Sequence, residues 1–300
     1  MGFLRKIKNR TKWLLSYPKS WINNIRYRKP TIKSVEETIL KIEKEKCSIA
    51  RYGDGEFNIM FGNNIDFQRY DKHLAQKMKD ILKSEHRDFL VGLPGELYYY
   101  KSQGLKKETE RYWKRFRRYH HGAIGKLLRK NKIYYHASMT RFYYCYTDQT
   151  KGEKYARLLK QIWDKRKVLF VEGEKSRLGV GNDFFDNAER VTRILCPTNN
   201  AFNYYDEIIA TIEKNVDKDT LVLLALGPTA TALAYDLYLK GYQAVDIGHV
   251  DIEYEWMRMG ATSKVAVKGK YTNEAEDGKI VEDMEDVTYK KQIIARIGID

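Results

Sequence analysis

Short apolar segments alternate with segments of helical periodicity along most of the 300-residue chain. From about residue 31 onwards, the apolar segments have the length of strands, and apolar residues recur at helical spacing between them. This alternation predicts an α/β fold with a mostly parallel sheet that is flanked by helices on both faces. The expected strands are 48–53, 89–94, 132–138, 167–173, 193–197, 221–227 and 244–248, and the expected helices include 34–46, 71–84, 153–164 and 201–214.

The segment 220–256, TLVLLALGPTATALAYDLYLKGYQAVDIGHVDIEYEW, shows the alternation most clearly. An apolar strand ends at Gly227, and Pro228 stands where the first residue of a helix is favoured. A helix rich in alanine and leucine is then expected to run to Lys240, with Gly241 as its cap. The next strand follows, so this segment predicts a βαβ unit with a right-handed crossover.

Polar or glycine-containing loops follow five of the expected strands. In open α/β sheets, ligands bind beyond the carboxyl ends of the strands, near the point where strand order reverses. We therefore expect these loops to converge on one edge of the sheet and to form the functional site. Their sequences are GDGEF at 53–57, EGEKSRLGVGND at 172–183, PTNNAF at 197–202, GPTAT at 227–231 and HVDIEYEW at 249–256.

Several loop residues suit an anionic ligand. Thr229 opens a helix, whose positive dipole end favours anions, although every helix has such an end. Lys175 and Arg177 supply positive charge, and Gly181 lets the backbone approach a ligand closely. The loop 172–183 is not a Walker A sequence. It is not a complete G-x-G-x-x-G sequence either, because Phe184 occupies the third glycine position.

Acidic residues gather at two of these strand ends. Side chains two residues apart point the same way in an extended segment, so Asp54 and Glu56 would face one direction. Carboxylates that share a cleft repel each other, and a hard divalent ion such as Mn²⁺ or Mg²⁺ relieves that repulsion. The alternative for each pair alone is a charged, solvated turn. If HVDIEYE stays extended, four side chains share a face in the same way: His249, Asp251, Glu253 and Glu255.

The formal net charge of +15 attracts nucleic acid, anionic lipid and phosphorylated small molecules alike. Residues 1–30 mix cations with apolar residues and contain no acid, which suits an amphipathic tail on an anionic membrane surface or, alternatively, a disordered leader. A second basic segment, 106–132, interleaves cations with aromatic residues, as single-stranded nucleic-acid sites do. Its Tyr112, Phe116 and Tyr119 also fall at helical spacing, which favours a helix that faces the core.

The apolar segments are far shorter than the roughly 20 residues that span a bilayer, and the first residues lack the features of a secretory signal. We therefore expect a cytoplasmic protein, and the basic tail is compatible with a place at the inner face of the cell membrane. Three widely spaced cysteines predict buried thiols rather than a disulfide framework or a zinc site.

Four segments, in this order and spacing, resemble the bacterial glycosyltransferases of the GT-D fold: SIARYGDGEF, VEGEKSRLGVGNDFF, RILCPTNNAF and LALGPTATALAYDLYLKGYQAVDIGHVDIEYEW. The resemblance covers residues 31–300, so we expect one glycosyltransferase domain there and a basic amphipathic tail at 1–30. It implies a Rossmann-like domain. It also implies an enzyme that transfers a hexose, such as glucose or galactose, from a UDP-sugar to a glycan acceptor in surface glycoprotein or polysaccharide synthesis.

The resemblance further implies an essential Asp-x-Glu motif that binds Mn²⁺, or Mg²⁺, and the donor diphosphate. The chain holds two such motifs, and we favour Asp54 and Glu56 as the metal ligands because adjacent glycines let a diphosphate approach. Asp251 and Glu253 are the alternative metal pair, or they act with His249 as candidates for the general base. The residues expected to bind the nucleotide sugar are Arg51, Gly53, Lys175, Arg177, Gly181, Asn182, Asn199, Asn200 and Thr229.

Two other functions stay open on the sequence alone. A nucleic-acid-binding module would use the basic segment 106–132, and its affinity would fall steeply with salt. Acids in the expected cleft would repel phosphate, so we expect no nucleic-acid partner. A nucleotide-binding phosphatase or nucleotidyltransferase would use the same cleft and would differ in its products.

Overall fold

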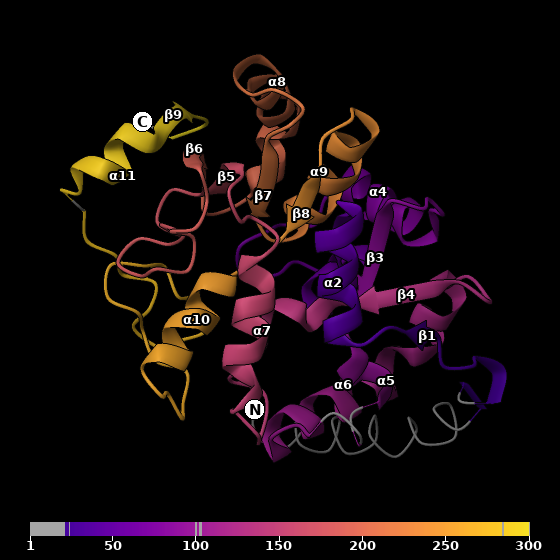
Figure 1. Cartoon of the computed structure of the whole chain (residues 1–300). Coiled ribbons are helices and arrows are strands. Elements are labelled where there is room, and N and C mark those ends of the chain that lie inside the picture. Colours follow the sequence, from indigo (N-terminus) through magenta and orange to yellow (C-terminus); the bar gives the residue numbers. More distant parts are fainter. Residues whose placement is uncertain (1–21, 24, 100, 102–103, 284, 300) are drawn as a thin grey trace, which may run out of the picture.

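The computed structural model describes residues 22–23, 25–99, 101, 104–283 and 285–299. Its centre is one parallel sheet. Within these residues, the strands follow the order β1-β4-β3-β2-β8-β7-β5-β6-β9, and every adjacent pair is parallel (Figure 1). The strands are β1 (Thr31–Ile32), β2 (Ser48–Arg51), β3 (Phe89–Leu93), β4 (Ile133–His136), β5 (Lys167–Gly173), β6 (Arg190–Cys196), β7 (Leu221–Ala225), β8 (Ala244–Asp246) and β9 (Ile293–Arg296).

All seven strands expected from the sequence are present, and the predicted α/β class is confirmed. The two edge strands, β1 and β9, were not expected. Strand β1 has only two residues, which is too short for a recognisable pattern. Strand β9 directly follows the short helix α11 (Val287–Gln292), so its apolar residues read as part of a helical segment.

Helices cover both faces of the sheet, and alternate strand residues pack into two separate cores. In β5, Val168 and Phe170 pack toward one core, whereas Leu169 and Val171 pack toward the other. The first core lies against α2 (Val35–Glu45), α7 (Lys151–Lys160) and α10 (Val250–Arg258). The second lies against α3 (Asp54–Met60), α4 (Lys72–Lys83), α8 (Tyr205–Asn215) and α9 (Pro228–Leu239).

Local sequence signals fix where several helices begin. The Ser34 hydroxyl accepts a hydrogen bond from the Glu37 amide, and the Ser34 amide donates one to the Glu37 carboxylate, which forms a capping box at α2. Pro228 opens α9 as expected, after Gly227 with φ of 53°. A Cβ on Gly227 would lie 2.4 Å from the Phe67 ring, so this turn requires glycine for both its conformation and its packing.

Two acidic segments that were expected to be extended are helical instead. Asp54 is the first residue of α3, and the segment 249–255 lies mostly in α10. Successive side chains on a helix are rotated by about 100°, so residues two apart no longer share a face. The expectation that His249, Asp251, Glu253 and Glu255 share one face is therefore wrong.

The basic segment 106–132 forms α6 (Lys107–Leu127), which packs beside the short helix α5 (Gly95–Tyr99). Phe116 is buried, but Tyr112 and Tyr119 remain 47% and 45% exposed, so only part of the expected aromatic stripe faces the core. Short 3₁₀ helices, η2 (Ala137–Thr140) and η3 (Ala201–Tyr204), follow β4 and β6.

Most of the predicted tail 1–30 lies outside the described residues. Among the residues that are described, each helix is too short or too polar to cross a membrane. The three cysteines are free; Cys47 and Cys196 are buried, as expected, whereas Cys145 is partly exposed.

Candidate active site

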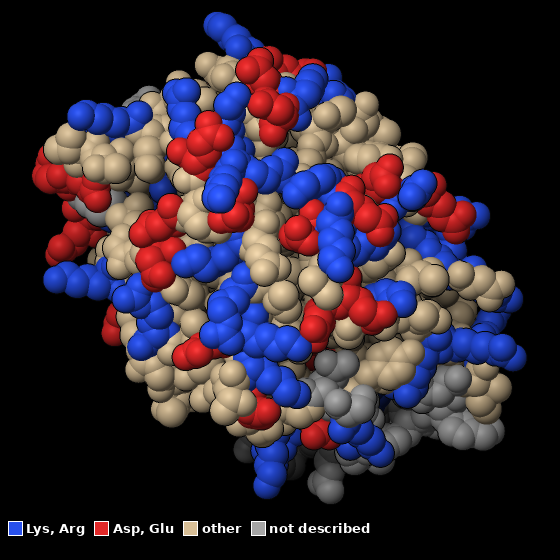
Figure 2. All heavy atoms as spheres, viewed as in Figure 1, with Lys and Arg blue, Asp and Glu red and all other residues tan. Residues whose placement is uncertain are grey.

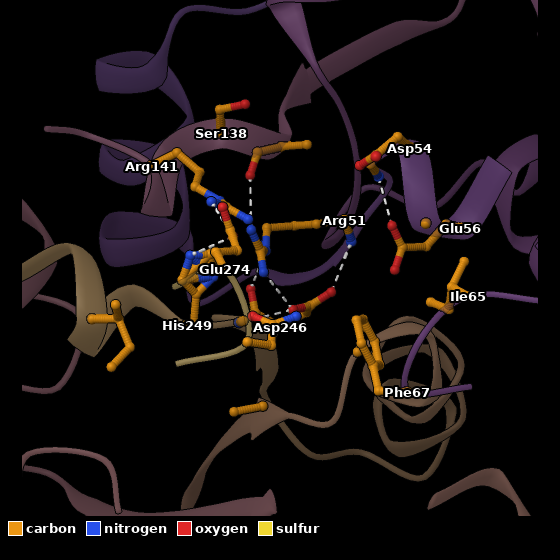
Figure 3. A pocket seen from close by; sticks show the side chains of 18 of the residues that line it. Arg51, Asp54, Glu56, Ile65, Phe67, Ser138, Arg141, Asp246, His249 and Glu274 are labelled. Atoms are coloured by element: carbon orange, nitrogen blue, oxygen red, sulfur yellow. Dashed lines mark hydrogen bonds and ion pairs between the residues drawn. The ribbon is translucent and has the colours of Figure 1, made fainter. Parts of the chain in front are cut away.

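A cleft of about 980 Å³ opens at the carboxyl ends of the strands. Its walls come from the loops after β2, β3, β4, β5, β6, β7 and β8, together with α6 and the C-terminal segment around Glu274. Figure 3 shows Asp54 and Glu56 on one side, Arg141, His249 and Glu274 on the other, and Arg51 and Asp246 between them. The expected convergence of the strand-end loops is thus present.

The turn between β2 and α3 presents the first acidic pair to this cleft. Gly53 precedes the helix, and its amide donates a 2.7 Å hydrogen bond to Glu56 Oε2. The Tyr112 hydroxyl of α6 donates to Asp54 Oδ2. Asp54 and Glu56 do not point in one direction, as an extended segment would require, but both line the cleft.

Glu56 lies in an environment that disfavours a negative charge. Burial raises its pKa to about 7, and the nearby carboxylates of Asp246 and Asp54 act in the same direction. Within the described part of the chain, neither Asp54 nor Glu56 forms an ion pair. Repelling oxygen ligands at an open cleft are the donor set that Mn²⁺ or Mg²⁺ prefers, so this pair fits a divalent ion.

Arg51 and Asp246 form an ion pair at the centre of the cleft floor. Arg51 Nη2 lies 2.8 Å from Asp246 Oδ1, and Arg51 Nε donates to the Asp246 carbonyl at 2.7 Å. The same guanidinium donates to the Ala137 carbonyl at 3.0 Å and to Thr140 Oγ1 at 2.6 Å. These bonds tie β2, β8 and η2 together, so Arg51 holds the strand ends in place.

The second acidic pair is buried and already has partners. Asp251 forms an ion pair with Lys270 and accepts hydrogen bonds from Gly179 N at 3.0 Å and Asn182 Nδ2 at 2.8 Å. Glu253 Oε2 accepts from the amides of two residues, Tyr143 at 3.1 Å and Tyr144 at 3.0 Å.

Glu253 is not among the described residues that line the cleft, whereas Asp251 is. Glu253 is fully buried, and burial raises its pKa. A metal ion bound by both residues would have to displace Lys270 from Asp251 and turn Glu253 out of the core. The geometry therefore favours Asp54 and Glu56 over the alternative pair.

A cationic cluster surrounds Glu274 on the opposite wall. Glu274 Oε1 lies 2.6 Å from Arg141 Nη1 and 3.1 Å from His249 Nε2, and Oε2 pairs with Lys264. Burial acts to raise the pKa of Glu274, but Arg141 and the other cations hold it well below its usual range. Burial and Arg141 lower the pKa of His249 to about 3, so its imidazole is neutral near pH 7.

Only some of the residues expected to bind the nucleotide sugar line the cleft. Arg51 and Gly53 line the cleft. Lys175 and Arg177 instead point to backbone carbonyls of the C-terminal segment, with Arg177 2.8 Å from the Gly269 oxygen and Lys175 3.4 Å from the Val281 oxygen. Outside the described lining of the cleft lie Lys175, Arg177, Gly181, Asn182, Asn199, Asn200 and Thr229.

These outlying residues have structural contacts of their own. Asn182 bonds Asp251 and Glu255, Asn200 Oδ1 accepts from the Arg69 amide at 2.8 Å, and Thr229 is buried against Gln68. Their proposed binding roles stay predictions.

Four residues that line the cleft were not among the site residues expected from the sequence: Tyr112, Arg141, Asp246 and Glu274. Asp246 ends the strand that was expected at 244–248, so the strand-end rule could have found it. Arg141 and Glu274 lie outside any periodic segment, and only the tertiary structure brings them together.

Comparison with known proteins identifies the family of this chain. Residues 49–275 match the model of the glycosyltransferase GT-D fold family, and the chain belongs to that family. It is 38% identical over 270 residues to glycosyltransferase GlyD of Streptococcus pneumoniae serotype 4, covering 89% of this chain and 32% of that protein. It is 33% identical over 274 residues to the probable glycosyl transferase Gly of Streptococcus gordonii, covering 90% of this chain and 39% of that protein. The chain therefore spans between about a third and two fifths of the length of these relatives.

Two solved structures share the whole fold. One, described as a distinct glycosyltransferase fold of the domain of unknown function 1792, superposes with a TM-score of 0.85 at 37% identity and covers 93% of this chain and all of that one. The other, a glycosyltransferase of the same domain type from Streptococcus sanguinis, has a TM-score of 0.84 at 32% identity and covers 90% of this chain. Likeness at this level confirms the predicted family and fold.

Proposed function

We propose that the chain is a metal-dependent hexosyltransferase that moves glucose or galactose from a UDP-sugar to a glycan acceptor. Family membership supports glycosyl transfer, and the cleft at the strand ends supports a nucleotide-linked donor. The observation that carries the proposal is the acidic turn Asp54–Glu56, which forms no ion pair with any described residue and faces a wall that contains Arg141 and Lys264.

In this proposal Asp54 and Glu56 hold Mn²⁺ or Mg²⁺. When bound, the ion would offset the negative charge that develops on the departing diphosphate. Arg141 and Lys264 would bind the donor's phosphate oxygens from the opposite wall, where Glu274 now lies between them. Arg51 would keep both walls at a fixed spacing through its bonds to Asp246 and η2.

His249 is the best-placed candidate to accept the proton of the acceptor hydroxyl if the reaction inverts configuration. Its imidazole lines the cleft and is neutral near pH 7, but its lowered pKa makes it a weak base until a bound anion offsets the charge of Arg141. Asp251 is less suitable, because Lys270 already neutralises it.

The acceptor and the place of action belong to the same proposal. We propose an acceptor glycan in surface glycoprotein or polysaccharide synthesis on the cytoplasmic side of the membrane. The basic residues 1–30 would bring the enzyme to the anionic inner face of that membrane.

Product analysis tests the reaction type. The full chain would be incubated with UDP-glucose or UDP-galactose, with Mn²⁺ or with EDTA, and the nucleotide products would be separated. Glycosyl transfer, or slow donor hydrolysis, releases UDP, and we expect Mn²⁺-dependent UDP release from one of the two donors. Release of UMP and a hexose phosphate would instead show attack at phosphorus and would support the phosphatase or nucleotidyltransferase alternative.

A further inference from the structure

Among the described residues, the excess of positive charge is concentrated in two segments. Residues 22–33 contain four cations and no acid, and residues 107–132 contain ten cations and two acids. Together they carry 12 of the 15 net positive charges. Residues 1–21 add six cations and no acid, so the rest of the chain has a small net negative charge.

The two segments lie side by side in the structure. The Tyr27 ring packs edge-on against His121 of α6, with 6.2 Å between the ring centres. A Cβ on Gly125 would lie 2.4 Å from Tyr27 Cγ, and one on Gly122 would lie 2.5 Å from Asn23 Nδ2. Both glycines on α6 thus make room for the segment 22–33, which places the cations of that segment beside the C-terminal half of α6.

The outer side of α6 presents a row of exposed cations. Four cations lie on one side of the helix, because three of them follow Lys107 by four, seven and eight positions: Arg111, Lys114 and Arg115. All four are exposed. Exposed apolar side chains accompany this surface, because Ile22 is 54% exposed, Ile25 66% and Tyr119 45%.

The face formed by α2, α7 and α10 differs in its charge pattern. On this face, acidic and basic side chains are interspersed (Figure 2). A net positive surface is therefore a property of α6 and its neighbouring segment rather than of the whole protein.

We propose that the outer side of α6, together with residues 22–33, is a docking surface for an anionic lipid bilayer. Clustered cations match anionic headgroups, and exposed isoleucines beside them gain by entering the interfacial region of a bilayer. Single-stranded nucleic acid would match the cations equally well, but it offers no apolar environment for Ile22 and Ile25.

The surface also adjoins the cleft. Tyr112 and Trp113 of α6 line the cleft, and they directly adjoin the exposed Arg111 and Lys114 in the sequence. Docking through α6 therefore brings the cleft mouth near the headgroup layer, where a membrane-attached acceptor would be presented. This last step rests on the proposed function, whereas lipid binding itself does not depend on sugar transfer.

Vesicle co-sedimentation of the full-length protein tests the surface. One variant carries Lys107→Gln, Arg111→Gln, Lys114→Gln and Arg115→Gln. A matched control carries Lys44→Gln, Lys72→Gln, Lys151→Gln and Lys214→Gln, which remove four exposed cations from α2, α4, α7 and α8. Each protein is mixed with vesicles of equal parts phosphatidylglycerol and phosphatidylcholine, with vesicles of phosphatidylcholine alone, and with a single-stranded oligonucleotide. Circular dichroism checks that each variant is folded.

We expect the unaltered protein to bind the anionic vesicles only, the α6 variant to lose at least about tenfold in partitioning, and the control to lose much less. Unchanged vesicle binding by the α6 variant would overturn the proposal, and so would equal losses in both variants. Binding to the oligonucleotide without binding to vesicles would assign the surface to nucleic acid instead. Because UDP release is measured separately, a failure of the proposed transfer reaction would leave this result intact.

Discussion

At the residue scale, the acids of the cleft fall into two groups that differ in their partners. Asp251 and Glu274 each lie against a lysine or arginine, whereas Asp54 and Glu56 face the cleft with hydroxyl and amide partners among the described residues. The cost of holding unpaired carboxylates together appears as the raised pKa of Glu56. A bound cation removes that cost, so this turn is where ligand binding and protonation are expected to be coupled.

The first prediction concerns the pH dependence of stability without a metal ion. The pKa of Glu56 is raised to about 7 in the folded chain, so the folded state holds a proton that the unfolded state releases at lower pH. The stabilisation is complete below the unfolded pKa and is lost as pH rises through about 7. Glu56→Gln should therefore raise the midpoint of urea unfolding in EDTA more at about pH 8 than at about pH 5. Equal effects at both pH values would contradict the assignment.

A second residue-scale prediction concerns Glu274. Its carboxylate lies among Arg141, His249 and Lys264, so it competes for the cations that we assign to the donor phosphates. Glu274→Gln should strengthen UDP binding by about threefold to tenfold at low salt, which is the scale of a partly exposed charge interaction. Isothermal titration calorimetry would measure the UDP affinity. The control is Glu276→Gln, because Glu276 is exposed on the same segment. Weaker UDP binding would show that Glu274 itself holds the donor.

At the element scale, a buried ion pair connects the two strands that carry the loop 174–182. Arg193 of β6 lies 2.5 Å from Glu172 of β5, and both side chains are almost fully buried. Arg193 also donates to the Leu178 carbonyl at 2.8 Å and to Gln292 of α11 at 2.7 Å. One guanidinium thus fixes β5, β6, the loop at the cleft edge and the C-terminal helix.

The third prediction follows from this pair. Arg193→Ala leaves Glu172 buried without its counter-charge, so it should cost about 3–5 kcal/mol in the free energy of unfolding. Lys167→Ala, which breaks the exposed pair with Asp219, should cost at most about 1 kcal/mol. Urea unfolding measures both values, and similar costs for the two variants would show that the buried pair has no special role.

At the scale of the whole molecule, the sequence predicts the sheet much better than the cleft. Strands such as β5 and β7 are buried on both faces, so their continuous apolar runs are visible in the sequence. The helical state of 249–255 was missed because acidic residues two apart look the same in a helix and in a strand. Side chains such as Arg141 and Glu274 come from irregular segments, and their meeting depends on packing that no local pattern encodes.

The sequence also predicts the distribution of charge only in part. Cation counts along the chain identify 106–132 as basic, but only the structure shows that α6 buries Phe116, exposes a row of cations and lies against residues 22–33. Among the described residues, the excess of cations thus lies in 22–33 and 107–132, two segments that contact each other.

We propose that Asp54 and Glu56, and not Asp251 and Glu253, form the metal-dependent donor site. The most direct test is calorimetric titration of UDP in the presence of Mn²⁺ against the unaltered chain, Asp54→Asn and Glu253→Gln, each first shown to be folded. We expect Asp54→Asn to weaken Mn²⁺-dependent UDP binding by at least about tenfold, because one of two anionic ligands is lost, and Glu253→Gln to bind UDP nearly normally. Normal binding by Asp54→Asn together with loss of binding by Glu253→Gln would contradict the proposal and would place the ion at α10.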